Sequence, residues 1–115
     1  MNNKHKFAWG VSIPRQLYFL LKDDRITARE FFTYSIILGE AKHDYRNFRV
    51  EDLAVDFHKL AGQCKCSEIE LRRMLNKFAM LRMIGSAERD GKTYLVIKLH
   101  QFSPSWVLEK RPVVA

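Results

Sequence analysis

The chain has only two cysteines, three prolines and five glycines in 115 residues, and it lacks any long apolar run. Cys64 and Cys66 are too close in sequence to form an ordinary disulfide with each other, so we expect a reduced, cytoplasmic protein rather than a disulfide-stapled one. No apolar run approaches the roughly 20 residues of a membrane-spanning helix, so we expect no membrane partner. The first residues are charged and are not followed by an apolar core, which predicts no secretion signal.

Sequence patterns of catalysis are also missing. The chain has no glycine-rich phosphate loop, no Gly-x-Ser-x-Gly motif and no acidic cluster placed for metal-dependent phosphoryl transfer. His58, Cys64 and Cys66 are the best candidates for a metal site, but zinc sites favour a wider cysteine spacing and a second ligand pair. We therefore predict that the protein is not an enzyme and needs no cofactor or metal.

Acidic residues are scarce relative to basic ones, with 13 Asp and Glu against 20 Lys and Arg, which gives a formal net charge of +7. The excess is concentrated in residues 1–25 and in residues 67–83. Such a field favours polyanionic partners. The alternative is a basic surface that only keeps the protein in solution.

A long helix is predicted to begin at Ser67, because Ser67 can cap it and Glu70 can bond back to the Ser67 amide. Apolar residues then recur at spacings of three and four, which is typical of a helix with one buried face. The apolar positions are Leu71, Met74, Leu75, Phe78 and Leu81, and Arg72, Arg73, Asn76 and Lys77 fall on the opposite side.

A β-hairpin is predicted after this helix, with strands from Ser86 to Arg89 and from Lys92 to Leu99. Asp90-Gly91 supplies the two positive φ angles that a two-residue turn requires. Arg89 and Lys92 would then lie at the tip of the hairpin.

Three further helices are expected before the long one. A short amphipathic helix around Leu17 precedes a helix that Thr27 caps, which we expect to run to about Lys42 with Thr33 in its polar sector. Residues 43–49 would form a polar connection with a short strand around Phe48. A third helix is expected from about Glu51 to Ala61, closed by Gly62 in the left-handed conformation.

These elements predict an α+β fold that is mostly helical. We divide the chain into an N-terminal arm and short helix (residues 1–25), a central domain (26–100) and a C-terminal extension (101–115) that Phe102 and Trp106 would fasten to the domain.

The segment from Ile26 to Ile84 with the following hairpin resembles the winged-helix domains of bacterial, plasmid and phage proteins, among them replication initiators, primosome-type proteins and small transcriptional regulators. Three segments carry the resemblance: Ile26-Thr27-Ala28-Arg29-Glu30-Phe31, Glu51-Asp52-Leu53-Ala54, and Leu71-Arg72-Arg73-Met74-Leu75-Asn76-Lys77-Phe78 before Met83-Ile84. It implies a winged helix with an extra N-terminal helix that binds DNA in replication initiation or transcription regulation of a mobile element. The chain departs from the pattern at Arg82, where glycine is usual, and at Arg49, where Ser or Thr would cap the second helix.

On this resemblance the long helix would read DNA. Arg73 and Asn76 would contact bases, because Arg can bond guanine and Asn can bond adenine in a bidentate manner. Arg72, Lys77, Arg89 and Lys92 would contact phosphates, which fix the register of the complex. The full expected DNA-binding set is Lys65, Ser67, Ile69, Arg72, Arg73, Asn76, Lys77, Arg89 and Lys92.

Duplex DNA is the favoured partner, and three alternatives stay open. Glu68 and Glu70 would repel phosphates, which favours a module that binds a protein in a replication or transcription assembly. Phe7 and Trp9, interleaved with lysines, would suit single-stranded DNA. A second copy of the chain is the third candidate, because Phe32 and Ile36 lie off the buried stripe of their helix, where either the N-terminal segment or a second subunit would cover them.

Overall fold

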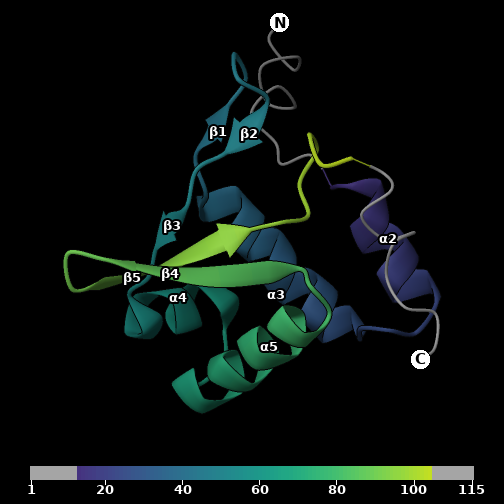
Figure 1. The fold of residues 1–115 in the computed structure, drawn as a ribbon. Helices are drawn as coiled ribbons and strands as arrows, with labels where there is room; N and C mark the ends of the chain where they lie inside the picture. Colours follow the sequence, from purple (N-terminus) through teal and green to yellow (C-terminus); the bar gives the residue numbers. More distant parts are fainter. Residues whose placement is uncertain (1–12, 105–115) are drawn as a thin grey trace, which may run out of the picture.

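The computed structural model describes residues 13–104, which form an α+β fold of helices packed against a small antiparallel sheet (Figure 1). This confirms the α+β class predicted from the sequence. Expectations about Phe7, Trp9 and Trp106 fall outside the described residues. The elements in chain order are α2 (Arg15–Lys22), α3 (Ala28–Glu40), β1 (His43–Asp44), β2 (Arg49–Val50), β3 (Leu53–Ala54), α4 (Phe57–Cys64), α5 (Glu68–Met80), β4 (Ile84–Arg89) and β5 (Lys92–Ile97).

The main sheet has three strands in the order β3-β5-β4, and both pairings are antiparallel. Leu95 on the central strand lies between Leu53 of β3 and Ser86 of β4. Asp90 and Gly91 have φ angles of 54° and 75°, so the turn between β4 and β5 forms as predicted. β1 and β2 make a separate two-stranded hairpin in the segment expected to be a polar connection.

The two long helices begin as the sequence predicts. The Thr27 side chain accepts a hydrogen bond from the Glu30 amide, and the Glu30 carboxylate accepts one from the Thr27 amide. Ser67 and Glu70 make the same reciprocal pair at the start of α5. Each pair satisfies two amides that the first turn of a helix leaves without intrahelical partners.

The predicted helix from Glu51 to Ala61 is wrong in its first half. Leu53 and Ala54 pair with Leu95 and Tyr94 as strand β3, and α4 begins only at Phe57. The apolar spacing of this short segment fits either a helix or a strand, and its pairing with β5 determines that it forms a strand. Asp56 caps α4 by accepting a hydrogen bond from the amide of Lys59.

The predicted closure of this helix by Gly62 is also wrong, because Gly62 lies inside α4 and Lys65 takes the left-handed conformation, with φ 61°. At the end of α5, Arg82 has φ 62° at the position where glycine is usual in the resembling family. Both side chains are exposed, although a left-handed backbone is uncommon for residues other than glycine.

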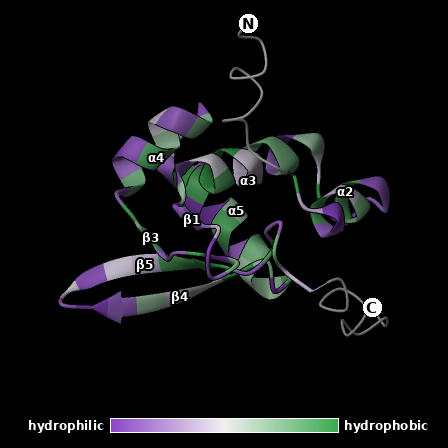
Figure 2. Cartoon of the chain, turned by 90° about the horizontal axis from the view of Figure 1, so that it is seen from above, coloured by the Kyte–Doolittle hydropathy of each residue, from purple (hydrophilic) through white to green (hydrophobic). Residues whose placement is uncertain are grey.

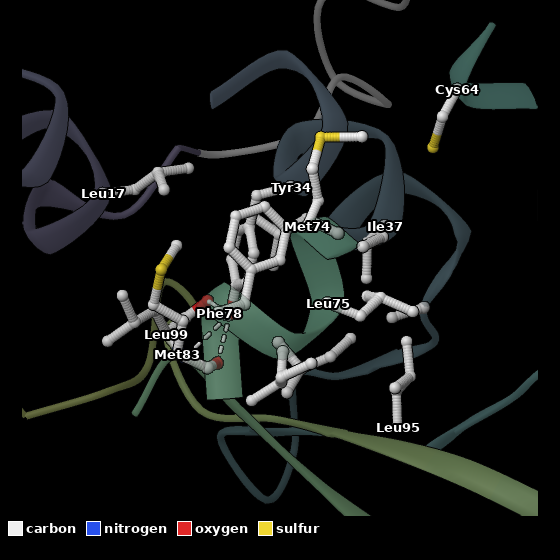
Figure 3. Close-up of a cluster of buried hydrophobic side chains, with 14 of the residues drawn as sticks. Leu17, Tyr34, Ile37, Cys64, Met74, Leu75, Phe78, Met83, Leu95 and Leu99 are labelled. Carbon is white, nitrogen blue, oxygen red and sulfur yellow. Dashed lines mark hydrogen bonds between the residues drawn. The ribbon is translucent and has the colours of Figure 1, made fainter. Parts of the chain in front are cut away.

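The core lies between α3, α5 and the sheet, and Tyr34 is at its centre (Figure 3). The Tyr34 hydroxyl donates a hydrogen bond of 2.7 Å to the Met83 carbonyl and accepts one of 3.2 Å from the Leu99 amide. Its ring meets the ring of Phe78 edge to face, with centroids 5.3 Å apart. Thr33, expected in the polar sector of α3, is instead fully buried. One tyrosine thus joins α3 to the residues just before β4 and just after β5, at the open end of the hairpin.

The N-terminal helix and the C-terminal segment pack on this core. Leu17 and Leu20 of α2 are fully buried in the same cluster, and Phe102 packs against it half-buried. The side-chain amide of Gln16 donates a hydrogen bond of 2.9 Å to the Pro104 carbonyl. Across residues 13–104, every helix is too short or too polar to span a membrane.

Candidate nucleic-acid interface

The outer face of α5 is the surface for which the sequence predicts DNA contacts. Leu71 and Phe78 are fully buried on its inner side, and Arg72, Arg73 and Asn76 are exposed on its outer side. Within residues 13–104, neither Arg73 nor Asn76 forms an ion pair or a side-chain hydrogen bond. These two groups are therefore available to a partner without breaking an internal bond.

Apolar side chains share this face. Ile69 is 73% exposed and Met80 is 83% exposed, near opposite ends of α5. Both fall in the same sector of the helix as Arg73 and Asn76, because the residues lie at helical spacings around one side. The outer face of α5 is thus a mixture of apolar and polar groups rather than a purely cationic surface.

Lys77 is one of the residues predicted to contact phosphates, but its side chain is paired with a residue of α3. Its ammonium lies 2.8 Å from the carboxylate of Glu30. Burial raises the pKa of Glu30, but hydrogen bonds from Lys77 and Thr27 outweigh burial, so the pKa lies below its usual value. Lys77 therefore ties α5 to the capped start of α3, and it can contact phosphate only by leaving this pair.

Arg72 lies over the ring of Phe57, with the guanidinium carbon 3.9 Å from the ring centroid. This cation–π contact orients the side chain while leaving its N–H groups open to solvent. Arg72 and Asn76 line one side of a groove of about 270 Å³ between α5 and the sheet, and Ser86 and Thr93 line the other side.

The tip of the β4–β5 hairpin extends away from the body, and its residues are hydrophilic (Figure 2). Arg89 forms an ion pair with Asp52 from the segment before β3, and its guanidinium lies 4.6 Å from the centre of the Tyr94 ring. Glu88 and Asp90 flank Arg89, so its charge is offset locally. Lys92 is exposed and makes no ion pair with the described residues.

The start of α5 is occupied by its own caps. Ser67 is committed to the capping pair with Glu70, and Glu68 lies 3.3 Å from Nδ1 of His58. Lys65 is exposed, and its carbonyl accepts a 2.6 Å hydrogen bond from the guanidinium of Arg29. This end of the helix is acidic and internally bonded, which is unfavourable for phosphates.

Arg29 and Asp52 are positioning residues that sequence reasoning did not identify. Arg29 also donates a 2.7 Å hydrogen bond to the Cys64 carbonyl, so it holds the last turn of α4 against α3. Asp52 neutralises Arg89. No local sequence signal marks either residue, because each partner lies more than 30 residues away in the chain.

Cys64 shows no reactive character. Burial, followed by the neighbouring Cys66, raises the pKa of the Cys64 thiol to about 11, whereas a reactive thiol has a lowered pKa. Within the part of the chain that the structure describes, no group of three or more His, Cys, Asp or Glu side chains is arranged to hold a metal ion.

Comparison of the chain with models of protein families, with curated proteins and with solved structures finds no match. The geometry of α5 and of its neighbours is therefore the basis on which a function can be assigned.

Proposed function

We propose that residues 26–100 form a winged-helix domain that binds duplex DNA through α5 and the β4–β5 hairpin. The order of elements supports this: helix α3, the short strand β3, helices α4 and α5, and then a hairpin. The pairing of β3 with β5, the second strand of that hairpin, completes a three-stranded sheet. The order of the helices and the hairpin is the one implied by the family that the sequence resembles, but that resemblance placed Leu53 and Ala54 in a helix rather than in a strand.

The observation that carries the proposal is the outward position of Arg73 and Asn76 on a helix whose opposite face is buried. Arg and Asn are suited to direct contacts with base edges in the major groove. Both lie beyond the acidic first turn of α5, so the middle and the C-terminal half of the helix would approach the DNA. Arg72 and Lys92 would contact phosphates on either side of these residues.

Fluorescence anisotropy of a labelled duplex, measured over a salt gradient, tests the proposal. We expect affinity to fall with salt at about 0.9 decade per decade for each phosphate contacted. Arg73→Ala should weaken binding by about tenfold, the size of one good base contact. Lys22→Ala is the matched control, because it removes one exposed cation from α2 and should leave binding nearly unchanged.

Equal losses for Arg73→Ala and Lys22→Ala would contradict the proposal, because binding would then depend on net charge alone. Binding that does not respond to salt would contradict it as well.

The exposure of Ile69 and Met80 favours a second candidate function, which is protein binding through α5. Exposed apolar side chains on one helix face are typical of a protein interface. This function predicts negligible affinity for DNA and an association that salt does not weaken. Sedimentation velocity of the chain and of Met80→Ser at low and high salt would measure self-association through this face.

A further inference from the structure

The β1–β2 hairpin presents two large aromatic side chains to solvent. Tyr45 is 64% exposed and Phe48 is 70% exposed, and both lie in the four-residue loop between Asp44 and Arg49. This hairpin is at the end of the molecule opposite α5 (Figure 1). The exposed rings therefore belong to a surface separate from the candidate DNA-binding face.

A half-buried ring supports the two exposed ones. Phe102 meets Tyr45 edge to face, with centroids 5.5 Å apart, and meets Phe48 in a similar way at 5.7 Å. The His43 ring stacks beside Tyr45 at 6.2 Å. We call these four residues, Tyr45, Phe48, Phe102 and His43, the aromatic patch. Because Phe102 packs on the core, the patch is anchored to the body of the protein.

The loop is fixed without being buried. Oδ1 of Asp44 accepts hydrogen bonds from the backbone amides of Arg46 and Asn47, and Oδ2 accepts one of 2.8 Å from the Asn47 side chain. Nε of Arg49 lies 3.5 Å from the same carboxylate. A loop held in this way orients its exposed rings before a ligand arrives, which lowers the entropy lost on binding.

Phe48 occupies a backbone conformation that does not suit a bulky side chain, with φ 52°. This left-handed region favours Gly, Asn and Asp, and an aromatic residue there is uncommon. Turn geometry therefore does not account for the phenylalanine. The ring packs on Phe102 on one side and is open to solvent over most of its surface, so it is positioned to contact a ligand.

Charge indicates the class of ligand. Residues 42–49 contain Lys42, Arg46 and Arg49 against the single carboxylate of Asp44, which the loop itself uses. A partner that matches this surface carries negative charge along its length and offers flat rings that can stack. Nucleotide chains with unpaired bases combine these two properties.

We propose that the aromatic patch binds single-stranded nucleic acid by stacking unpaired bases on Tyr45 and Phe48, with Lys42 and Arg46 contacting the phosphates. Insertion into a lipid surface is less compatible with the loop, because Arg46 and Asn47 lie between the two rings and would enter the membrane first. The patch shares no residue with α5, so this proposal does not depend on duplex binding there.

The test is fluorescence anisotropy of the full chain with a labelled oligothymidylate of about 12 nucleotides, a length within the range that single-strand binders cover. Tyr45→Ala and Phe48→Ala should each weaken binding by about fivefold to 100-fold, the range measured for loss of one stacked base. Tyr45→Phe keeps the ring and should retain most of the affinity. Lys22→Ala is the control, because it removes one exposed cation from α2, outside the aromatic patch, and it should leave the oligothymidylate affinity nearly unchanged.

Several results would overturn the proposal. Unchanged oligothymidylate affinity in both alanine variants would show that the rings take no part. Absence of oligothymidylate binding by the full chain would show that the patch does not bind single-stranded nucleic acid. Ring-dependent binding to vesicles of phosphatidylserine and phosphatidylcholine, without binding to the oligonucleotide, would assign the patch to membranes.

Discussion

The two hairpins of this protein differ in how they are built. β4–β5 has a two-residue turn with both φ angles positive, and β5 is the central strand of the main sheet. β1–β2 pairs over two residues on each strand, and a network around the Asp44 carboxylate holds its longer loop. Backbone conformation and core packing define the first hairpin, whereas polar side chains define the second.

The groups presented by the two tips differ as well. At the β4–β5 tip, Arg89 is paired with Asp52 and acidic residues alternate with basic ones. At the β1–β2 tip, Tyr45 and Phe48 are open and basic residues are in excess. The hairpin that is integral to the fold thus offers fewer free binding groups than the peripheral one. We therefore regard β4–β5 as the structural hairpin, and we expect mutations in it to affect stability more than mutations in β1–β2 do.

The largest effect is expected from a cavity in the structural hairpin. Leu95 is 4% exposed on the central strand, so Leu95→Ala should lower the free energy of unfolding by about 2–5 kcal/mol. Phe48→Ala in the other hairpin should lower it by less than about 1 kcal/mol, because the ring is largely in solvent. Urea denaturation measures both values. A loss above about 2 kcal/mol for Phe48→Ala would show that β1–β2 is part of the core.

Left-handed positions should respond in opposite ways in the two hairpins. Gly91→Ala places a side chain at φ 75° and should lower the free energy of unfolding by about 1 kcal/mol. At Phe48 the wild-type residue already bears this cost. Phe48→Gly should therefore be more stable than Phe48→Ala by about 1 kcal/mol in the same urea assay. Equal stability of the two variants would mean that the loop adjusts its backbone when the ring is removed.

These positions also show how far the sequence predicts the fold. The Asp90-Gly91 turn and both capping boxes were predictable, because each depends on residues within four positions of one another. The left-handed conformations of Phe48 and Lys65 were not, since neither residue type favours them. Strand β3 was missed because its two residues are ordered by pairing with a strand 40 positions later.

The candidate site was predictable only in outline. The apolar stripe of α5 correctly placed Arg73 and Asn76 on the outer face. It could not show that Lys77 and Arg89 are paired, because Glu30 and Asp52 reach them from other parts of the chain. The exposure of Tyr45 and Phe48 was equally unpredictable, since aromatic residues in a short polar segment are as consistent with burial as with exposure.

A smaller effect is expected on removal of the Arg89 partner. If β4–β5 contacts DNA in the proposed way, Asp52→Asn should strengthen duplex binding by about twofold to fivefold, because it frees one guanidinium held by a surface ion pair. Asp23→Asn makes the same change in net charge on the exposed C-cap of α2 and should have little effect. Anisotropy at low salt measures both. Equal gains in the two variants would exclude a local role for Arg89.

The smallest effect concerns acid and the β1–β2 loop. Hydrogen bonds from the Asn47 side chain and then from the Asn47 and Arg46 amides hold the pKa of Asp44 below its usual value. A carboxylate with a lowered pKa stabilises the folded loop fully above its unfolded pKa of about 4, and this contribution is lost as the pH falls through the lower folded value.

We therefore expect the Asn47 amide resonance in ¹⁵N–¹H spectra to shift with a midpoint below about pH 4, while the Leu95 amide in the other hairpin stays constant. Asp44→Asn should abolish the shift, because a neutral amide does not titrate. A midpoint at or above the usual Asp pKa would contradict a role for the carboxylate in holding the loop.

Because ordering of this loop presents the rings, oligothymidylate affinity should weaken in Asp44→Asn even at neutral pH, although the variant is one unit more positive. Net charge alone would produce the opposite change, so the sign of the effect separates loop order from electrostatic attraction.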